Sequence, residues 1–404
     1  MAPPDLLLLL CVSAHAGVLD TWGGGENGMA GNTGVATHGA HAAWYNPAMI
    51  HADRFDGSGE YVHGDGSLQL QGADKAAGDP SVAPTRGALL GAELNSYWLG
   101  LERMNLGAAV FLPAAGPFGW HETPVAAGDV GPMATAPRVG SDLSRLDVAV
   151  GGSYWLHDRV SVGASADISA SFETLTFIEV TDFEAAAEAP RGQEVTIRPT
   201  FHPIVGASVL AGNPEGVRVR LGLVGRTARL MDDTGSSAIT LLGADFTYHH
   251  HYVRYYAPPT LTIGADIEPL DALSIRLEGS YEAWSQAISP TAETLEGDWV
   301  DAPTARIGMR GTVNRLRVLG GYGYDPGPGR SIPRDTLIVD APSHAIHVGF
   351  GAVVHRNEDA RALQLMVGLQ SRRFVPRSLP TQPQGAVEMS GDLLGLSAGL
   401  GWGV

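Results

Sequence analysis

The chain has 404 residues, a formal net charge of −17 and 53 glycines, while charged residues make up only 17% of it. A soluble protein of this length usually carries more charge and less glycine, so one large barrel is favoured over two or three soluble domains. Nucleic acid is excluded as a partner, because binding phosphates requires clustered lysine and arginine and this chain has a single lysine, Lys75.

Residues 1–16 have the features of a secretory signal peptide. An apolar core at 6–12 is too short to span a bilayer, and residues 14–16 (Ala-His-Ala) fit the small-x-small cleavage rule. No lysine or arginine precedes the core and Asp5 is acidic, which leaves the true start of the signal open. The only cysteine, Cys11, lies in this segment, so we expect a mature chain with no disulfide and no cysteine-based metal site.

Residues 17–50 show no regular alternation and are rich in glycine, alanine, threonine and asparagine. A segment of this length is too small to fold alone. It is therefore expected to be either a disordered tail or a plug held inside a larger structure.

The rest of the chain alternates with period two in segments of about ten residues. Within 159–172, an apolar set that includes Val160, Val162 and Ile168 interleaves with serine, glycine and aspartate. No run of about 18 apolar residues follows the signal, so a membrane fold has to be a closed barrel whose strands satisfy each other's backbone groups. About fourteen such segments are present, an even number as in bacterial barrels. They lie near 55–63, 86–95, 104–112, 146–157, 159–172, 201–212, 216–228, 259–268, 272–284, 304–313, 315–324, 344–355, 361–374 and 392–404.

The connections between these segments alternate in length. Tight turns are predicted at 157–158, 213–216, 268–271, 314 and 357–359. Long links are predicted at 64–85, 113–145, 173–200, 229–258, 285–303, 325–343 and 375–391. Short periplasmic turns and long external loops are the rule for outer-membrane barrels, and both termini then lie on the periplasmic side.

Residues 25–50 resemble the N-terminal hatch of the FadL family of long-chain fatty-acid and toluene channels, a Gly/Ala-rich run that ends in Tyr45-Asn46-Pro47-Ala48. Three further stretches are similar to the family. They are 111–119, which bears Pro and Gly at the end of the third strand, the Tyr-x-x-Trp-Ser sequence at 281–285, and 320–328 with its continuation at 341–344. The resemblance runs from about residue 17 to the end of the chain and departs at Val404, where an aromatic residue is commoner.

The resemblance implies an all-β fold, a 14-stranded antiparallel transmembrane β-barrel of residues 51–404 in the bacterial outer membrane, with residues 17–50 as a hatch in its lumen. It implies that external loops catch a hydrophobic molecule, that hatch movement passes it to an inner site, and that it leaves sideways into the membrane. The expected partners are a fatty acid or hydrocarbon and outer-membrane lipid, bound by a monomer. No enzymatic activity, cofactor or metal is expected.

Five residues are candidates for the hatch and its gate. Asn46, Pro47 and Ala48 are expected to seat the hatch against the wall beside the third strand, which carries Gly107 on its lumenal face and Pro113 at its end. The alternative is that the Asn-Pro-Ala sequence simply turns the chain into the first strand.

Apolar residues in the links after the fifth and seventh strands are candidates for an entry groove, because the family forms its groove from these two loops. Exposed apolar clusters often mark binding sites. The alternative is that these residues extend the strands above the membrane. They are Leu175, Phe177, Ile178, Ile239, Leu241, Leu242, Phe246 and Tyr248.

Strand parity places several arginines in the lumen, where a guanidinium could hold a fatty-acid carboxylate by a forked hydrogen bond. The candidates are Arg218, Arg220, Arg276 and Arg310. The alternative, which we favour, is that these charges pair with acidic residues across the lumen.

Two other classes of function compete with hydrophobic uptake. An outer-membrane lipid-modifying enzyme is disfavoured because no Gly-x-Ser-x-Gly sequence is present. A general porin or an adhesin has no use for a hatch. The three adjacent histidines at 249–251 make a poor metal site, because neighbours on an extended segment point to opposite faces.

Overall fold

The computed structural model describes residues 25–52, 55–71, 85–97, 100–113, 120–122, 141–143, 146–180, 191–212, 216–241, 244–288, 299–330, 341–356, 362–380 and 386–403. The predicted signal peptide, residues 17–24 of the predicted hatch, and Leu242 lie outside the described residues.

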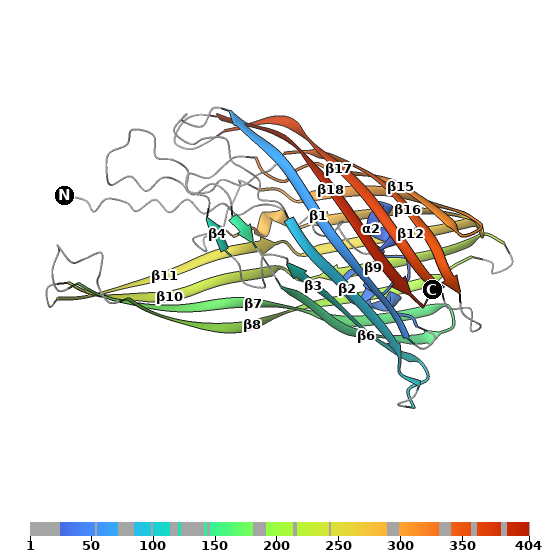
Figure 1. Ribbon diagram of the computed structural model, residues 1–404, viewed down its shortest axis with the longest axis horizontal. Coiled ribbons are helices and arrows are strands. Elements are labelled where there is room, and N and C mark those ends of the chain that lie inside the picture. The colour runs from blue at the N-terminus through green and yellow to red at the C-terminus, as the bar shows by residue number, and fades with distance from the viewer. Residues whose placement is uncertain are drawn as a thin grey trace.

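A closed antiparallel barrel of 14 strands forms the body of the molecule (Figure 1). Its strands are β1 (Phe55–Gln71), β2 (Thr85–Asn95), β3 (Met104–Pro113), β6 (Asp147–His157), β7 (Val160–Val180), β8 (Arg191–Leu210), β9 (Arg218–Arg226), β12 (Thr260–Leu270), β13 (Leu273–Glu282), β14 (Ala302–Val313), β15 (Leu316–Asp325), β16 (Ser343–Arg356), β17 (Ala362–Pro380) and β18 (Ala386–Trp402). The ladder closes where β1 pairs with β18, with Gly59 opposite Leu400, and where β7 pairs with β8. Closure leaves the wall without a free edge, as lipid requires. Each predicted strand coincides with one of these.

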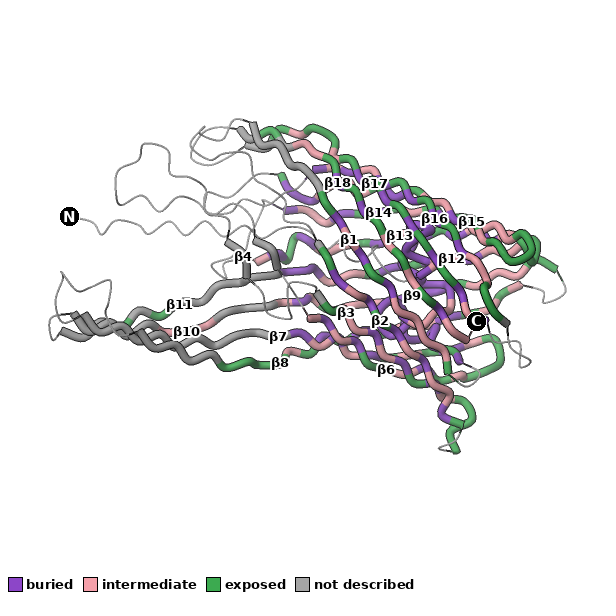
Figure 2. The backbone as a smooth tube through the Cα atoms, in the orientation of Figure 1, coloured by how far each residue is buried: buried purple, intermediate pink, exposed green. Residues whose placement is uncertain are grey.

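The two faces of the wall follow the predicted alternation (Figure 2). On β7, Ser161, Ser165 and Asp167 are buried in the lumen, whereas Val162 on the opposite face is 37% exposed. On β18, Leu396 is 50% exposed. Such an apolar outer face is the surface that acyl chains cover. No helix among the described residues is long and apolar enough to cross a membrane.

The predicted long links at 173–200 and 229–258 are largely strands rather than loops, which corrects the prediction. β7 and β8 continue beyond the barrel, and β10 (Arg229–Leu241) and β11 (Ala244–Ala257) form a hairpin beside them. β10 pairs in parallel with the outer part of β7, with Ile239 opposite Ile178. The result is a four-stranded arm that projects from one end of the barrel (Figure 1). Pairing in this arm satisfies backbone groups that a loop would leave to water.

A short hairpin of β4 (Trp120–Glu122) and β5 (Ser141–Leu143) lies within the link predicted at 113–145. The opposite end of the barrel carries the tight turns. Asn314, between β14 and β15, has a φ of 57°, a left-handed conformation that asparagine tolerates better than most residues.

The N-terminal segment, defined here as residues 25–52, lies inside the barrel (Figures 1 and 2). It contains α2 (Glu26–Met29), α3 (Ala42–Tyr45) and the 3-10 turn η1 (Pro47–Met49). Met49 and Ile50 are fully buried, and they pack with Trp44 and Tyr45 against Ala109 of β3 and Ala149 of β6. The segment is therefore packed against the wall rather than free.

Candidate functional site

Glycines of the lumenal face mark the path of the N-terminal segment along the wall. A Cβ on Gly222 of β9 would collide with the carbonyl of Val35, and one on Gly321 of β15 would collide with the carbonyl of Ala30. A Cβ on Gly91, Gly163 or Gly308 would likewise meet backbone atoms of the segment, whereas one on Gly206 would meet the Asn46 side chain. Close approach of two backbones requires residues without a Cβ. The glycine-rich face of the alternation is thus explained by what fills the lumen.

Serines of β6 and β7 hold carbonyls at the end of the segment. The hydroxyls of Ser153, Ser161 and Ser165 donate to the carbonyls of Ile50, Ala48 and Ala43, each at 2.7 Å. Each hydrogen bond satisfies a buried acceptor that neither α3 nor η1 satisfies internally. Strand alternation places serines on the polar face of β7, but it does not predict that they bind carbonyls of the segment.

Glu278 of β13 binds the middle of the segment. Its Oε1 accepts hydrogen bonds from the backbone N–H of Gly34 at 2.9 Å and of Val35 at 3.1 Å. Its Oε2 accepts hydrogen bonds from Thr33, from the backbone N–H at 2.6 Å and from the side-chain hydroxyl at 3.0 Å. A carboxylate that accepts several buried donors is among the stronger polar contacts in a protein. A lumenal acid on a strand was visible in the sequence, whereas its partner was not.

The Asn-Pro-Ala sequence lies against β7 and β8, not beside β3 as predicted. The Asn46 side chain caps η1 by accepting the Ala48 N–H at 3.1 Å, and its Nδ2 donates to the Val35 carbonyl at 2.6 Å. The Pro47 backbone passes over Gly163 of β7. The asparagine thus joins two parts of the segment, which bends the chain toward these strands.

Ile50 lies beside the third strand, as α3 does. A Cβ on Gly107 of β3 would meet the Ile50 Cδ1 at 3.1 Å. Pro113, at the end of β3, pairs in register with Gly87 of β2. Gly107 therefore contacts the segment, and Pro113 is the last residue of β3.

Lumenal arginines bind the first helix of the segment through Glu26. Arg317 forms an ion pair with Glu26, and Arg310 lies 3.5 Å from its Oε2. Arg276 donates to the Asn27 side chain at 2.7 Å. Burial acts to raise the pKa of Glu26, but the neighbouring guanidiniums outweigh burial and hold this pKa below its usual value. These charges are engaged with the segment and with wall carboxylates, which is the alternative favoured from the sequence.

The two other candidate arginines differ in their surroundings. Arg218 lies at the end of the barrel that carries the tight turns, and it forms ion pairs with Glu268 at 3.0 Å and Asp271 at 3.1 Å. Arg220, two residues further along β9, faces a cavity at the same end of the barrel.

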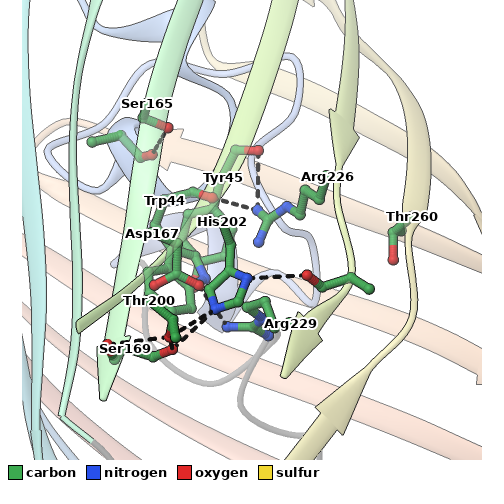
Figure 3. A network of polar contacts seen from close by, with 12 residues as sticks. Trp44, Tyr45, Ser165, Asp167, Ser169, Thr200, His202, Arg226, Arg229 and Thr260 are labelled. Atoms are coloured by element: carbon green, nitrogen blue, oxygen red, sulfur yellow. Dashed lines mark hydrogen bonds and ion pairs between the residues drawn. The ribbon is translucent and has the colours of Figure 1, made fainter. Parts of the chain in front are cut away.

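A polar network covers the outer side of α3 (Figure 3). Arg226 donates to the carbonyls of Trp44 and Tyr45, which are the last residues of α3. The guanidinium of Arg229 lies 5.2 Å from the ring centroid of Trp44 and 3.3 Å from the carboxylate of Asp167. The outer face of α3 is therefore fixed by two arginines that follow one another closely in the sequence.

His202 continues this network along the wall (Figure 3). Its Nδ1 lies 3.0 Å from the Ala228 carbonyl, which only accepts, so Nδ1 carries the proton. Its Nε2 then accepts from Ser169 at 3.0 Å. These contacts tie His202 to β7 and to the residues that follow β9.

An aromatic cluster lies where β11 joins the barrel, beside the outer ends of β13 and β14. Trp284 and Trp299 have ring centroids 5.1 Å apart, and Tyr256 meets Trp284 edge-on at 6.2 Å. Together they form an apolar wall at the arm end of the barrel.

The residues predicted for an entry groove lie in the arm. Leu175, Phe177 and Ile178 are on β7, Ile239 and Leu241 on β10, and Phe246 and Tyr248 on β11. Register brings their backbones together, since Ile239 pairs with Ile178 on one side and with Phe246 on the other. These residues lie on strands that continue beyond the barrel.

Comparison with known proteins identifies the fold. No protein-family model matches the chain, and no curated protein matches it. Among solved structures, the P. putida toluene transporter TodX matches with a TM-score of 0.62 and 12% identity over 95% of this chain and 99% of that one. A Pseudomonas aeruginosa FadL homologue matches with a TM-score of 0.59 and 14% identity over 97% and 98%. The Ralstonia pickettii toluene transporter TbuX matches with a TM-score of 0.55 and 14% identity over 94% and 98%. The chain has the fold of these outer-membrane channels along nearly its whole length, which confirms the resemblance at the level of fold.

Proposed function

We propose that this protein is an outer-membrane channel for the uptake of hydrophobic molecules, with the N-terminal segment as its hatch. The observation that carries the proposal is the filled lumen. Residues 25–52 are held inside the barrel by the wall serines, by Glu278 and by Arg226, so they occupy space that water and hydrophilic solutes would need. A hydrophobic molecule gains nothing from an aqueous pore, because leaving water is what favours its transfer.

The route of entry follows from the arm and the aromatic cluster. The arm places candidate groove residues on β7, β10 and β11 outside the barrel, and Tyr256, Trp284 and Trp299 form an apolar surface where it joins. A molecule captured there reaches the outer face of α3, where Trp44 lies under Arg229. Shifting the segment would open the way inward, and lateral exit would release the molecule into lipid.

Fatty acids and hydrocarbons are the substrate classes that this route suits. The structures with the same fold include a toluene transporter, a monoaromatic hydrocarbon channel and a FadL homologue. These names describe the similar proteins and not this one, but they indicate that a monoaromatic hydrocarbon and a fatty acid are the first compounds to test on this protein. A general porin is the second candidate, but it is disfavoured because the N-terminal segment is packed inside the barrel.

The test compares the uptake of hydrophobic molecules with the permeation of small sugars. The protein should be expressed in an outer membrane that lacks its own hydrophobic channels, and uptake of labelled toluene and labelled oleate should be compared with an empty vector. We expect faster uptake of at least one of the two, while liposomes that contain the purified protein swell in small sugars no faster than empty liposomes. Rapid swelling without hydrophobic uptake would identify a porin instead.

A further inference from the structure

A cavity of about 400 Å³ lies at the end of the barrel that carries the tight turns. His38 and His51 of the N-terminal segment line it on one side, with ring centroids 5.0 Å apart. Trp155 of β6 and Leu210 of β8 line it from the wall, and Trp155 packs edge-on against His51 at 5.3 Å. The cavity therefore has aromatic rings on both the segment and the wall, and its volume is in the range of small-molecule sites.

Two side chains that line this cavity carry buried polar atoms of opposite kinds. The indole Nε1 of Trp155 is a donor and has no hydrogen-bond partner within the described part of the chain. The Oδ1 of Asn105 is an acceptor in the same condition, and this residue is only 4% exposed. Asn105 of β3 lies opposite Ser153 of β6, and Trp155 is the next residue on that face of β6, so the two side chains are neighbours on the lumenal wall. Buried polar atoms without partners in the protein are uncommon, and they are typical of positions that bind a ligand or water.

The orientation of the Asn105 amide follows from its other contact. The Ser153 hydroxyl donates its single proton to the Ile50 carbonyl at 2.7 Å. It can therefore only accept from Asn105, whose Nδ2 lies 3.5 Å from the serine oxygen. This leaves Oδ1 as the amide atom without a partner. A ligand that satisfies both unpaired atoms has to accept from the Trp155 indole N–H and to donate to the Asn105 side-chain carbonyl.

A hydroxyl group meets both requirements, because it carries one proton and two lone pairs. A carboxylate does not, because it has no proton to donate to Asn105. Burial lowers the pKa of His38 to about 3, so at neutral pH its ring is uncharged and offers an aromatic face rather than a cation. A phenol combines a hydroxyl with an aromatic ring, and it keeps its proton at neutral pH.

We propose that this cavity binds a hydroxylated aromatic compound, a phenol. The phenol O–H would donate to the Asn105 Oδ1, and its oxygen would accept from the Trp155 indole N–H. Its ring would pack against His38, His51 and Leu210, since aromatic pairs add to the stabilisation from burial alone. Arg220 also lines the cavity, and a guanidinium is attracted to the face of an aromatic ring. This inference deepens the proposed function by naming a substrate class, and it rests on that function for the supply of ligand but not for binding itself.

The experiment measures binding to the full-length protein in nanodiscs by fluorine NMR, with empty nanodiscs to subtract partition into lipid. The two probes are para-fluorophenol and fluorobenzene, which differ only by the hydroxyl group. We expect para-fluorophenol to bind about tenfold more tightly, because fluorobenzene would leave both buried atoms unpaired. A third probe, para-fluorobenzoate, should bind more weakly than para-fluorophenol because it has no proton to donate, and cyclohexanol should compete less well than phenol because it has no aromatic ring.

Two variants remove one hydrogen bond each. Trp155→Phe keeps an aromatic ring without the N–H, and Asn105→Leu keeps the size of the side chain without the carbonyl. Each should weaken para-fluorophenol binding about threefold or more and should change fluorobenzene binding by less than about twofold. Trp402→Phe, at the end of β18 and away from the residues that line the cavity, is the matched control and should change neither. Heat modifiability on gels confirms that each variant is a folded barrel.

Several outcomes would overturn the inference. Equal binding of para-fluorophenol and fluorobenzene would show that Trp155 and Asn105 hold water rather than a ligand hydroxyl. Tighter binding of para-fluorobenzoate would assign the cavity to anions, and equal losses in Trp155→Phe and Trp402→Phe would place the phenol elsewhere. Phenol binding by a protein that takes up neither toluene nor oleate would sustain the site and refute the channel. Uptake without any preference for the phenol would do the reverse, so the two failures are distinguishable.

Discussion

The Glu278 carboxylate accepts the backbone N–H of Gly34 at 2.9 Å, which ties the middle of β13 to the middle of the N-terminal segment. The same carboxylate accepts both donors of Thr33 and the amide of Val35. One side chain therefore satisfies a stretch of buried backbone that has no secondary structure of its own.

Replacing Glu278 by glutamine should loosen the segment. The amide offers one acceptor oxygen where the carboxylate offers two, and its NH₂ group would face donors, so a loss of about 1.5–3 kcal/mol is expected for the contacts broken. Limited proteolysis of the intact barrel should then cleave within residues 25–52 faster than in the native protein. Glu388→Gln, on an exposed part of β18, is the control. Equal cleavage of native protein and Glu278→Gln would contradict the role.

Alanine at Gly222 should destabilise the packed segment, because its methyl group would collide with the Val35 carbonyl. Overpacking of this kind costs about 1–3 kcal/mol. Gly225, on the same strand but the opposite face, has its nearest non-local atom 3.8 Å from the position of a Cβ. Gly225→Ala should therefore leave the thermal midpoint unchanged while Gly222→Ala lowers it, and the reverse order would refute the path assigned to the segment.

Removing residues 25–43 should open the lumen. This deletion takes away α2 and the partners of Glu278 and Arg276 while it leaves the carbonyls of Ala48 and Ile50 bound to their serines. A barrel of this size leaks unless something fills it. Ion conductance in planar bilayers should increase several-fold, and uptake of toluene or oleate should lose its selectivity over small sugars. Conductance equal to that of the native protein would mean that the segment is not a plug.

Arginine at Ala166, on the lipid face of β7, should destabilise the barrel by about 2–4 kcal/mol, because a charge would enter the hydrocarbon region. Ala166→Leu should be nearly neutral. Ser165→Arg cannot serve as the control, because the Ser165 hydroxyl donates to the Ala43 carbonyl and an arginine at this position would displace the segment. Urea titration in lipid measures the free energy of unfolding of Ala166→Arg and Ala166→Leu. Equal values for the two variants would rule out a lipid-facing position for residue 166.

Acidification should weaken the segment through His38. Burial, with added repulsion from Arg220, lowers the pKa of His38 to about 3, whereas its ordinary value is 6.5. The unfolded chain therefore takes up a proton first, so the stability contributed by His38 is complete above pH 6.5 and is lost as the pH falls from 6.5 toward 3. The carboxylate of Glu26, whose pKa is lowered, adds a further loss below its ordinary value of 4.5.

Proteolysis of the segment should accordingly be faster at pH 5 than at pH 7.5, and His38→Gln should reduce this difference. His355→Gln, near the end of β16 and exposed, is the matched control. A pH dependence that His38→Gln leaves unchanged would assign the effect to other groups.

The sequence by itself determined the barrel. Fourteen alternating segments predicted the strands and their faces, because a strand in a closed wall has one side toward lipid and the other toward the lumen. It also identified residues 17–50 as different in kind, because they show no regular alternation. Alternation failed at β10 and β11, where paired strands were taken for loops, because a ribbon above the membrane has no lipid face to keep its pattern regular.

Only the tertiary structure decided what the lumenal groups do. Nothing in the local sequence links Glu278 to Thr33, or Ser153 to Ile50, since these pairs are separated by 245 and 103 residues. From the sequence, the wall glycines could be a bias in composition. The structure shows that Gly222 has no room for a side chain, because the Val35 carbonyl lies against it. Asn46 lies against β8 rather than β3 because its own hydrogen bonds bend the segment. Periodicity is a property of one strand and its two environments, whereas these contacts depend on where the barrel places a second chain segment.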